Sequence, residues 1–146
     1  MIRQLTRTGI LLAGMAVTGS ALADGDVEAK YRQSVMKSIG GHMSAMGTIL
    51  KEQVHLEDLA LHAEGLAGLA EIAPEVFPEG SGVEKSKALP AVWEKPEAFA
   101  EAMNRLVEAS DAMASAAKSG EMSLIGPAIQ ELGGSCKGCH DDFKAE

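Results

Sequence analysis

An all-α fold, arranged as an antiparallel four-helix bundle, is predicted by three features of this 146-residue sequence. Apolar residues recur three and four positions apart through most of the chain, as they do along one face of a helix. No stretch has the alternating, β-branched pattern of a strand. Two short breaks and one long connection separate four such helical stretches, and amphipathic helices joined in this way bury their apolar faces in a bundle.

The first 23 residues are expected to lie outside this bundle. Arg3 and Arg7 precede an apolar run, and Ala21-Leu22-Ala23 has the small-residue pattern of a signal-peptidase site. A membrane anchor is the weaker alternative, because the run is too short to span a bilayer. We therefore predict a cleaved signal peptide over residues 1–23, export to the periplasm without stable membrane insertion, and one mature domain over residues 24–146.

Two helices are predicted in the first half of that domain. The first extends from about residue 26 to 52, and its apolar positions are Tyr31, Val35, Met36, Ile39, Met43, Met46, Ile49 and Leu50. The second extends from about residue 55 to 73, with an inner face formed by Leu59, Ala63, Leu66, Ala70 and Ile72. A long connection between helix pairs follows from Pro74 to Pro96, because it holds four of the five prolines.

Two further helices are predicted after this connection. The third begins near Pro96, where proline is tolerated in a first turn, and ends at about residues 118–120. Ser123 is expected to cap the fourth, which continues to the C-terminus. Pro127 must lie in or just beyond the first turn, since proline deeper inside would break the helix. The single Trp93 is expected to pack where the long connection enters the third helix.

Composition limits both the core and the partners. Only five residues are aromatic and much of the remaining core is alanine and methionine, a small core for four helices that a bulky cofactor would fill. All 21 acidic residues but only 11 of the 13 basic ones follow residue 23, which gives the mature chain a net charge of −10. This acidity argues against nucleic acid as a partner and favours a cationic docking partner or a well-solvated monomer or dimer.

The chemistry is concentrated at the end of the chain, in the CxxCH sequence of Cys136, Cys139 and His140. Cysteines three apart on a helix place both sulfur atoms on one face, where they can form thioethers with the two vinyl groups of haem. The adjacent histidine then supplies the proximal iron ligand. A thioredoxin-like pair would follow a strand, a zinc site would need a fourth ligand, and a disulfide would leave the histidine unexplained. One covalently bound haem c is therefore predicted.

The terminal stretch "GGSCKGCHDDFK" resembles the class II cytochromes c, the group that contains cytochrome c′. In this group haem attaches near the C-terminus of a four-helix chain. The similarity extends through "KYRQSVMKSIGGHMSAM" at 30–46 and "ALPAVWEKPEAF" at 88–99, and so covers essentially the whole mature chain.

This resemblance implies a ligand on the other face of the iron. From the residues alone Met36 is expected to be a core methionine, but in the family its position faces the distal side of the haem, and low-spin members supply a methionine sulfur there. The resemblance therefore implies that His140 and Met36 bind the iron. It also implies that Arg32 lies near a haem propionate, that Lys144 lies beside the proximal histidine, and that the chain can form a homodimer.

The other possible ligands are expected to have structural roles. Met43 and Met46 are predicted to pack, Met103, Met113 and Met122 are predicted to fill the core, and His42 remains a minor candidate. His55 and His62, seven residues apart, are expected to share one rim of the second helix. Gly40 and Gly41 are expected to let the first helix approach the haem closely, or else to loosen it.

The predicted function is that of a periplasmic, mono-haem electron carrier that serves redox partner proteins. We do not expect the protein to be an enzyme, because the sequence shows no nucleophile paired with a general base. The alternative is a five-coordinate, high-spin cytochrome c′ that binds nitric oxide or carbon monoxide, and a zinc-stapled interaction domain is a third possibility.

Overall fold

The computed structural model describes residues 25–146 and confirms an all-helical fold for them. The four long helices are α1 (Gly25–Glu52), α2 (Leu59–Ile72), α4 (Pro96–Ser119) and α5 (Met122–Phe143). Three short helical turns lie between them: η1 (Leu56–Asp58), η2 (Ala73–Val76) and α3 (Ala91–Glu94). The predicted signal peptide lies outside the described residues. None of the helices in the described range combines the length and apolar composition that a bilayer crossing requires.

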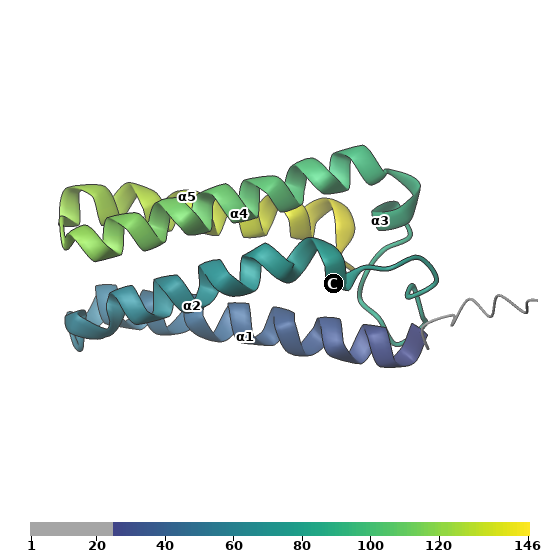
Figure 1. Cartoon of the computed structure of the whole chain (residues 1–146), viewed down its shortest axis with the longest axis horizontal. Coiled ribbons are helices and arrows are strands. Elements are labelled where there is room, and N and C mark those ends of the chain that lie inside the picture. Colours follow the sequence, from purple (N-terminus) through teal and green to yellow (C-terminus); the bar gives the residue numbers. More distant parts are fainter. Residues whose placement is uncertain (1–24) are drawn as a thin grey trace, which may run out of the picture.

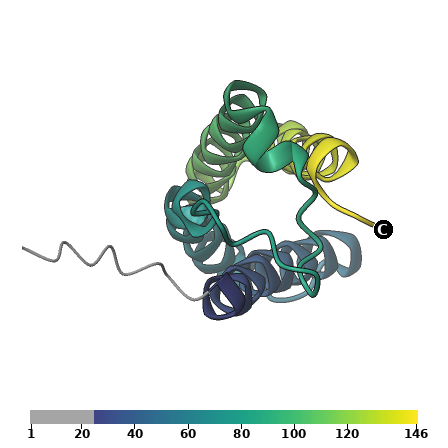
Figure 2. The ribbon, with the colours of Figure 1, turned by 90° about the vertical axis from the view of Figure 1, so that its right-hand side faces the viewer.

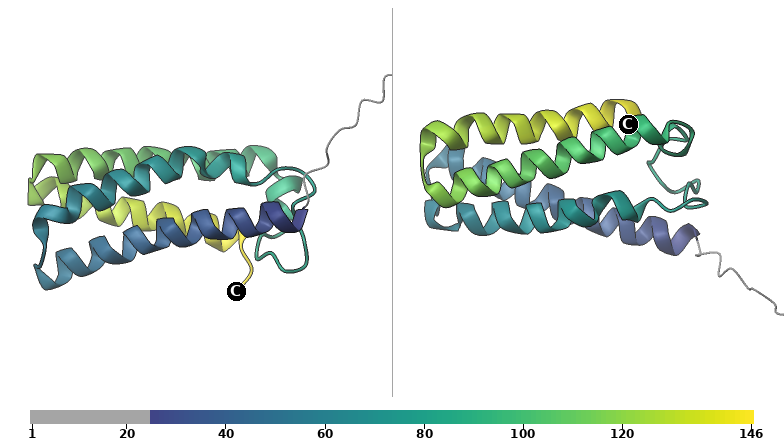
Figure 3. Two further views of the ribbon diagram at one scale, coloured as in Figure 1. Left: turned by 60° about the horizontal axis from the view of Figure 1, so that its bottom comes forward. Right: turned by 45° about the horizontal axis from the view of Figure 1, so that its top comes forward.

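The four long helices surround a common axis (Figures 1 and 2). Close backbone contacts join α1 to α2, α2 to α4 and α4 to α5, but no comparable contact joins α1 to α5. Consecutive long helices run antiparallel within each pair, as the views in Figure 3 also show. Three sides of the bundle are therefore tightly packed, and the fourth side, between α1 and α5, is more open.

The core consists of the apolar faces that the periodicity predicts. Met46, Leu66, Met113 and Leu132, one from each long helix, are fully buried. The faces of α2 and α4 are rich in buried alanine, and these small side chains allow the two backbones to approach closely. Because the tight packing is concentrated at these seams, the remaining interior volume lies toward α1 and α5.

The helix ends differ from the predicted ones in several places. Glu121, and not Ser123, occupies the position before α5, so the predicted serine cap is wrong. Pro127 lies in the second turn, just beyond the first as predicted, and its missing N–H removes only the bond to the carbonyl of Ser123. Ile72 is 36% exposed and Met122 is 51% exposed, because each lies at a helix end where the neighbouring helices no longer cover it.

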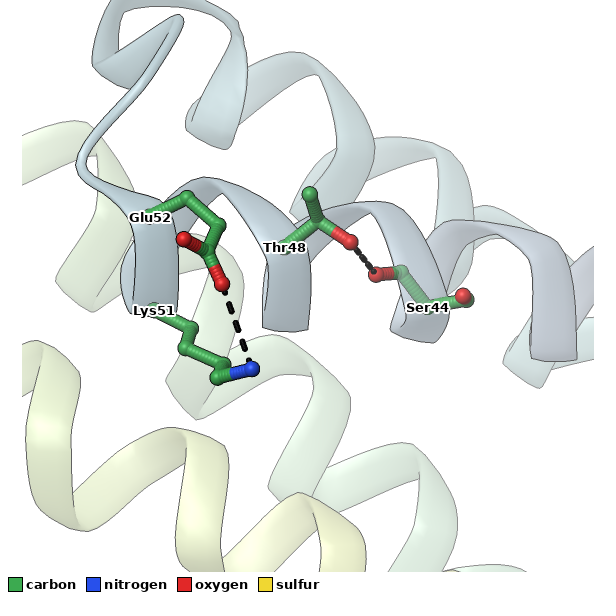
Figure 4. A network of polar contacts seen from close by, with 4 residues as sticks. All are labelled: Ser44, Thr48, Lys51 and Glu52. Carbon is green, nitrogen blue, oxygen red and sulfur yellow. Dashed lines mark hydrogen bonds and ion pairs between the residues drawn. The ribbon is translucent and has the colours of Figure 1, made fainter.

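One exposed face of α1 carries local polar contacts near its C-terminal end (Figure 4). The Thr48 hydroxyl donates to the carbonyl of Ser44 at 3.1 Å, and the Lys51 Nζ lies 3.2 Å from a carboxylate oxygen of Glu52. Both ion-pair side chains are exposed, and such pairs contribute little to stability. This face is a solvated helix surface.

The long connection between α2 and α4 crosses one end of the bundle (Figure 2). Trp93 on α3 donates its indole N–H to the carbonyls of Phe77 and Pro78, at 3.1 and 3.2 Å, which confirms its predicted place at the entry to the third long helix. The end of the chain is paired to the same connection by an isolated antiparallel bridge between Ala88 and Lys144. The connection thereby fixes the end of α5.

Candidate haem site

A cavity of about 830 Å³ lies on the α1 and α5 side of the bundle. It falls within the range of sites that enclose a small molecule or cofactor, which is roughly 300–1,000 Å³. Its walls come from α1, from the connection between α2 and α4, and from α4 and α5. Its apolar lining includes Met36, Ile39, Met43, Phe77, Phe99, Met103, Leu106 and Phe143.

The predicted attachment residues lie along this cavity on α5. Cys136, Cys139 and His140 all line it, and both cysteines are free and half-buried. Burial raises the pKa of Cys136, and burial together with the neighbouring Cys136 raises the pKa of Cys139 to about 11. Both groups are therefore thiols at neutral pH, and thioether formation with a vinyl group starts from a thiol. The residues present fit a covalently held haem in cavity size, apolar lining and donor set.

The zinc alternative gains no support from the described residues. Nowhere in residues 25–146 do three or more His, Cys, Asp or Glu side chains form a group that could hold a metal. A structural zinc site uses four protein ligands.

His140 lies in the last turn of α5 in a form suited to bind a metal. Its pKa is lowered, first by burial and then by the charge of Lys144, with Asp141 acting in the opposite direction. An imidazole kept neutral retains the lone pair that an iron ligand needs. The backbone around it is held in place because the N–H of Ala145 donates to the carbonyl of Lys87 at 2.8 Å, and the N–H of Leu89 donates to the carbonyl of Phe143 at 2.9 Å.

Met36 lines the same cavity from α1 and is half-buried. The structure thus brings Met36 and His140, 104 residues apart in sequence, to one cavity from different helices. Gly40 also lines it, and a Cβ atom there would meet nothing within 4 Å. That Met36 binds the iron stays a prediction.

Two other methionines, Met43 and Met103, also line the cavity, a role that the sequence does not predict for them. Met43 was expected only to pack and Met103 only to fill the core, and both border the cavity. The signal for α4 was present, because Phe99, Met103 and Leu106 are spaced i, i+4, i+7 and so share one helix face. Periodicity identifies an inner face but cannot tell a cavity wall from a packed core.

Arg32 is buried at one end of the cavity, and its partners come from the connection between α2 and α4. Nη1 donates to the carbonyl of Val76 at 3.1 Å and to the Ser81 hydroxyl at 2.7 Å, and Nη2 donates to the carbonyl of Ser81 and the Ser86 hydroxyl, both at 2.8 Å. Its guanidinium also lies 4.9 Å from the centre of the Phe77 ring. Burial lowers the pKa of Arg32, an effect opposed by Glu28. All four terminal N–H groups are thus used by this connection, and the predicted propionate contact stays a prediction.

His42, the minor candidate for an iron ligand, and the two histidines of the second helical region lie away from the cavity. His42 and His62 contact each other where α1 meets α2, and neither lines the cavity. His55 precedes η1 with a φ of 50°, so it does not share a rim of α2 with His62, and that prediction is wrong. The helical periodicity could not reveal that the chain turns sharply at His55.

The charge around the cavity is opposite in sign to the charge of the chain. Four exposed lysines line it, namely Lys37, Lys85, Lys87 and Lys144, and no Asp or Glu does so. The whole chain has a formal net charge of −8. A partner that approaches this opening therefore meets positive charge, whereas the net charge alone suggested a cationic partner.

Comparisons with known proteins agree on one family. The family model described as Cytochrome C' matches residues 28–144. The chain is 36% identical over 147 residues to the cytochrome c' of Rhodospirillum rubrum, an alignment that covers 99% of this chain and 100% of that protein.

Solved structures show the same four-helix architecture. Cytochrome c prime from Shewanella frigidimarina is 30% identical, with a TM-score of 0.80 over 85% of this chain and 98% of the other. Two structures of cytochrome c prime from Alcaligenes xylosoxidans, one a ferrous variant with bound NO and one a variant with bound carbon monoxide, are each 25% identical with a TM-score of 0.78 over 85% of this chain and 98% of theirs. The chain belongs to the cytochrome c′ family, whose members bind one covalent haem c, and its CxxCH sequence at 136–140 is consistent with that attachment.

Proposed function

We propose that this protein holds its haem c through Cys136 and Cys139 with His140 as the proximal iron ligand, and that it binds nitric oxide or carbon monoxide on the other face of the haem. One observation carries the proposal: the cavity that contains the CxxCH residues of α5 is otherwise walled mainly by apolar side chains of α1 and α4. Two solved relatives, described with bound NO and carbon monoxide, support the same ligands for this chain.

The protein's own residues set the conditions for such binding. Bound haem would supply an iron atom that can take a diatomic ligand, and His140 would hold that iron. Ile39, Phe99 and Leu106 line the cavity with apolar surface, which excludes water and suits a small uncharged ligand. The lowered pKa of His140 favours the neutral imidazole, and backbone hydrogen bonds fix the end of α5 around it. No enzymatic step is implied.

Electron transfer with a Met36 ligand is the second candidate, and it has one specific observation in its favour. Met36 is half-buried and borders the same cavity as His140. A thioether is a soft ligand that would favour ferrous iron and leave no open position for a gas. The methionine-ligated, low-spin subgroup gains no support from the relatives described above, which carry the name cytochrome c′. We therefore place gas binding first.

Electron paramagnetic resonance of the ferric protein separates the two candidates. Under the proposal the wild type gives a high-spin signal, and Met36→Leu leaves that signal high-spin. Met43→Leu is the matched control, because Met43 lines the cavity from the same helix. A low-spin wild type that becomes high-spin in Met36→Leu but not in Met43→Leu would replace gas binding with electron transfer.

Export and assembly complete the proposal. We propose a periplasmic location after cleavage of residues 1–23, redox contacts with other proteins, and a homodimeric state. Mass spectrometry of the protein isolated from the periplasm tests the first point, since a chain that still begins at Met1 would contradict it. Sedimentation analysis of the purified holoprotein tests the last.

A further inference from the structure

His42 and His62 form a pair that has no part in the haem site. His42 lies on α1 and His62 on the antiparallel α2, and their Nδ1 atoms are 3.1 Å apart. The rings meet edge to face, with centroids 5.3 Å apart and planes inclined by 64°. Both side chains are half-buried, so the pair is reachable from solvent while the two helices hold it in place.

The seam between the helices is shaped around this pair. A Cβ atom at Gly65, on α2, would lie 2.6 Å from Cε1 and 2.9 Å from Nε2 of His42. Any larger residue at this position would therefore displace the His42 ring. Fully buried Met46 and Leu66, each one turn beyond a histidine, pack the same two helices. The imidazoles are thus positioned by the fold and do not simply lie on a mobile surface.

We propose that His42 and His62 bind one divalent copper ion at this seam. Two imidazole nitrogens bound to one metal at about 2.0–2.1 Å are separated by roughly 2.9 Å at a right angle and about 3.4 Å at the tetrahedral angle. The observed separation of 3.1 Å lies between these values, so small ring rotations suffice to direct both lone pairs to one ion.

The chemistry of the pair selects the metal. The pKa of His42 is lowered by burial and by His62, which favours the neutral imidazole that binds metals. Only two protein ligands are present, since no group of three or more His, Cys, Asp or Glu in residues 25–146 could hold a metal. A structural zinc site needs four protein ligands, whereas Cu(II) binds nitrogen donors more tightly than other divalent ions and can complete a tetragonal site with water.

Isothermal titration of the ferric holoprotein with Cu(II) in a glycine buffer tests the proposal. In the holoprotein the haem occupies the cavity around His140, so the added copper reports on the remaining histidines. The expected result is one strong copper site per chain in the wild type. His42→Gln and His62→Gln should each weaken copper binding at least tenfold, because each leaves a single imidazole.

His55→Gln is the matched control, because its side chain is 73% exposed and lies outside the pair. This variant should bind copper as the wild type does. Gly65→Ala is an independent test, because it keeps both histidines but displaces the His42 ring. This variant should also weaken copper binding. Far-UV circular dichroism and copper-free melting establish that each variant is folded. Equal copper affinity in wild type, His42→Gln and His62→Gln, or a loss confined to His55→Gln, would overturn the proposal.

Discussion

Arg32 is the single residue on which the arrangement of the crossover depends most. Its terminal N–H groups bond to two carbonyls and two hydroxyls of the connection between α2 and α4, and the described part of the chain gives it no salt-bridge partner. Hydrogen bonds to a charged donor contribute about 1.5–3 kcal/mol each, and buried acceptors left without a partner carry a further penalty. The guanidinium thus substitutes for the regular hydrogen bonding that the connection lacks.

Replacement of Arg32 should therefore destabilise the whole fold. We expect Arg32→Met to lower the free energy of unfolding by about 3 kcal/mol, measured by urea denaturation of the holoprotein. Arg105→Met is the control, because Arg105 is exposed and its ion pair with Glu101 spans 4.0 Å at the surface; we expect a change within about 0.5 kcal/mol. Similar losses in the two variants would show that the crossover does not depend on this guanidinium.

The lowered pKa of His42 predicts that stability depends on pH. Because the pKa of folded His42 lies below its ordinary value of 6.5, the unfolded chain binds more protons between those two pKa values. Stability from this group is complete above pH 6.5 and is lost as the pH falls through the folded pKa.

His42→Gln removes this contribution. Between about pH 7.5 and about pH 5, the wild type should lose more free energy of unfolding than His42→Gln, in urea titrations at the two pH values. His55→Gln should behave as the wild type. If wild type and His42→Gln lose the same amount, the histidine pair is not the source of the pH dependence.

At the scale of elements, two glycines on α2 separate the effect of helix propensity on stability from the effect of packing between helices. A Cβ atom at Gly68 would meet nothing within 4 Å, whereas one at Gly65 would collide with the His42 ring. Gly68→Ala should raise the free energy of unfolding by about 0.5–1 kcal/mol, because alanine is the better helix former.

Gly65→Ala should not raise the free energy of unfolding. The gain from the better helix former is offset by the cost of displacing the His42 ring between α1 and α2. Thermal melts of the two variants beside the wild type give the comparison. If both substitutions raise the melting temperature equally, the seam accommodates a methyl group and the pair is less constrained than its geometry indicates.

The long helices could be predicted from sequence because periodicity and turn residues act locally. The predicted range of 26–52 became Gly25–Glu52, and the helix that begins at Pro96 ends before Gly120, whose φ of 69° marks a left-handed cap. The attachment residues Cys136, Cys139 and His140 could be predicted because they are consecutive along the chain. The sequence indicated the cavity only indirectly, because the few aromatic and many small apolar residues left the core too small to fill the bundle.

The remaining features depend on contacts between distant residues, which periodicity does not contain. Arg32 meets Ser81 across 49 positions and His42 meets His62 across 20, and nothing local in the sequence indicates either pairing. Met122 was misplaced for a related reason, because burial at a helix end depends on which neighbour extends past it.

At the scale of the whole molecule, net charge and local charge have opposite signs. The cavity opening has Lys37, Lys85, Lys87 and Lys144 and no acidic residue, on a chain of net charge −8. An anion that approaches the cavity is attracted by these lysines and repelled by the net negative charge of the chain. Added salt screens both interactions.

Reaction with a small anionic oxidant shows whether the nearby lysines or the net negative charge of the chain controls access to the haem. Oxidation of the ferrous protein by ferricyanide should slow as ionic strength rises, because local attraction is screened. Replacing Lys85 and Lys87 with Glu should lower the rate at low salt about tenfold, whereas Lys51→Glu, at the far end of α1, should change it little. A wild-type rate that increases with salt would mean that the net charge governs access.

The open fourth side of the bundle holds the candidate haem site. Tight seams between α1 and α2, α2 and α4, and α4 and α5 leave the interior volume between α1 and α5, where the CxxCH residues and an apolar wall face the same space. We propose that this space admits a diatomic ligand to the haem iron.

Titration of the reduced holoprotein with carbon monoxide, followed by its Soret absorption, tests whether the iron has an open position. We expect a five-coordinate ferrous spectrum that converts completely to a CO-bound spectrum with one equivalent of gas per haem. A six-coordinate, low-spin ferrous spectrum that carbon monoxide leaves unchanged would contradict the proposal.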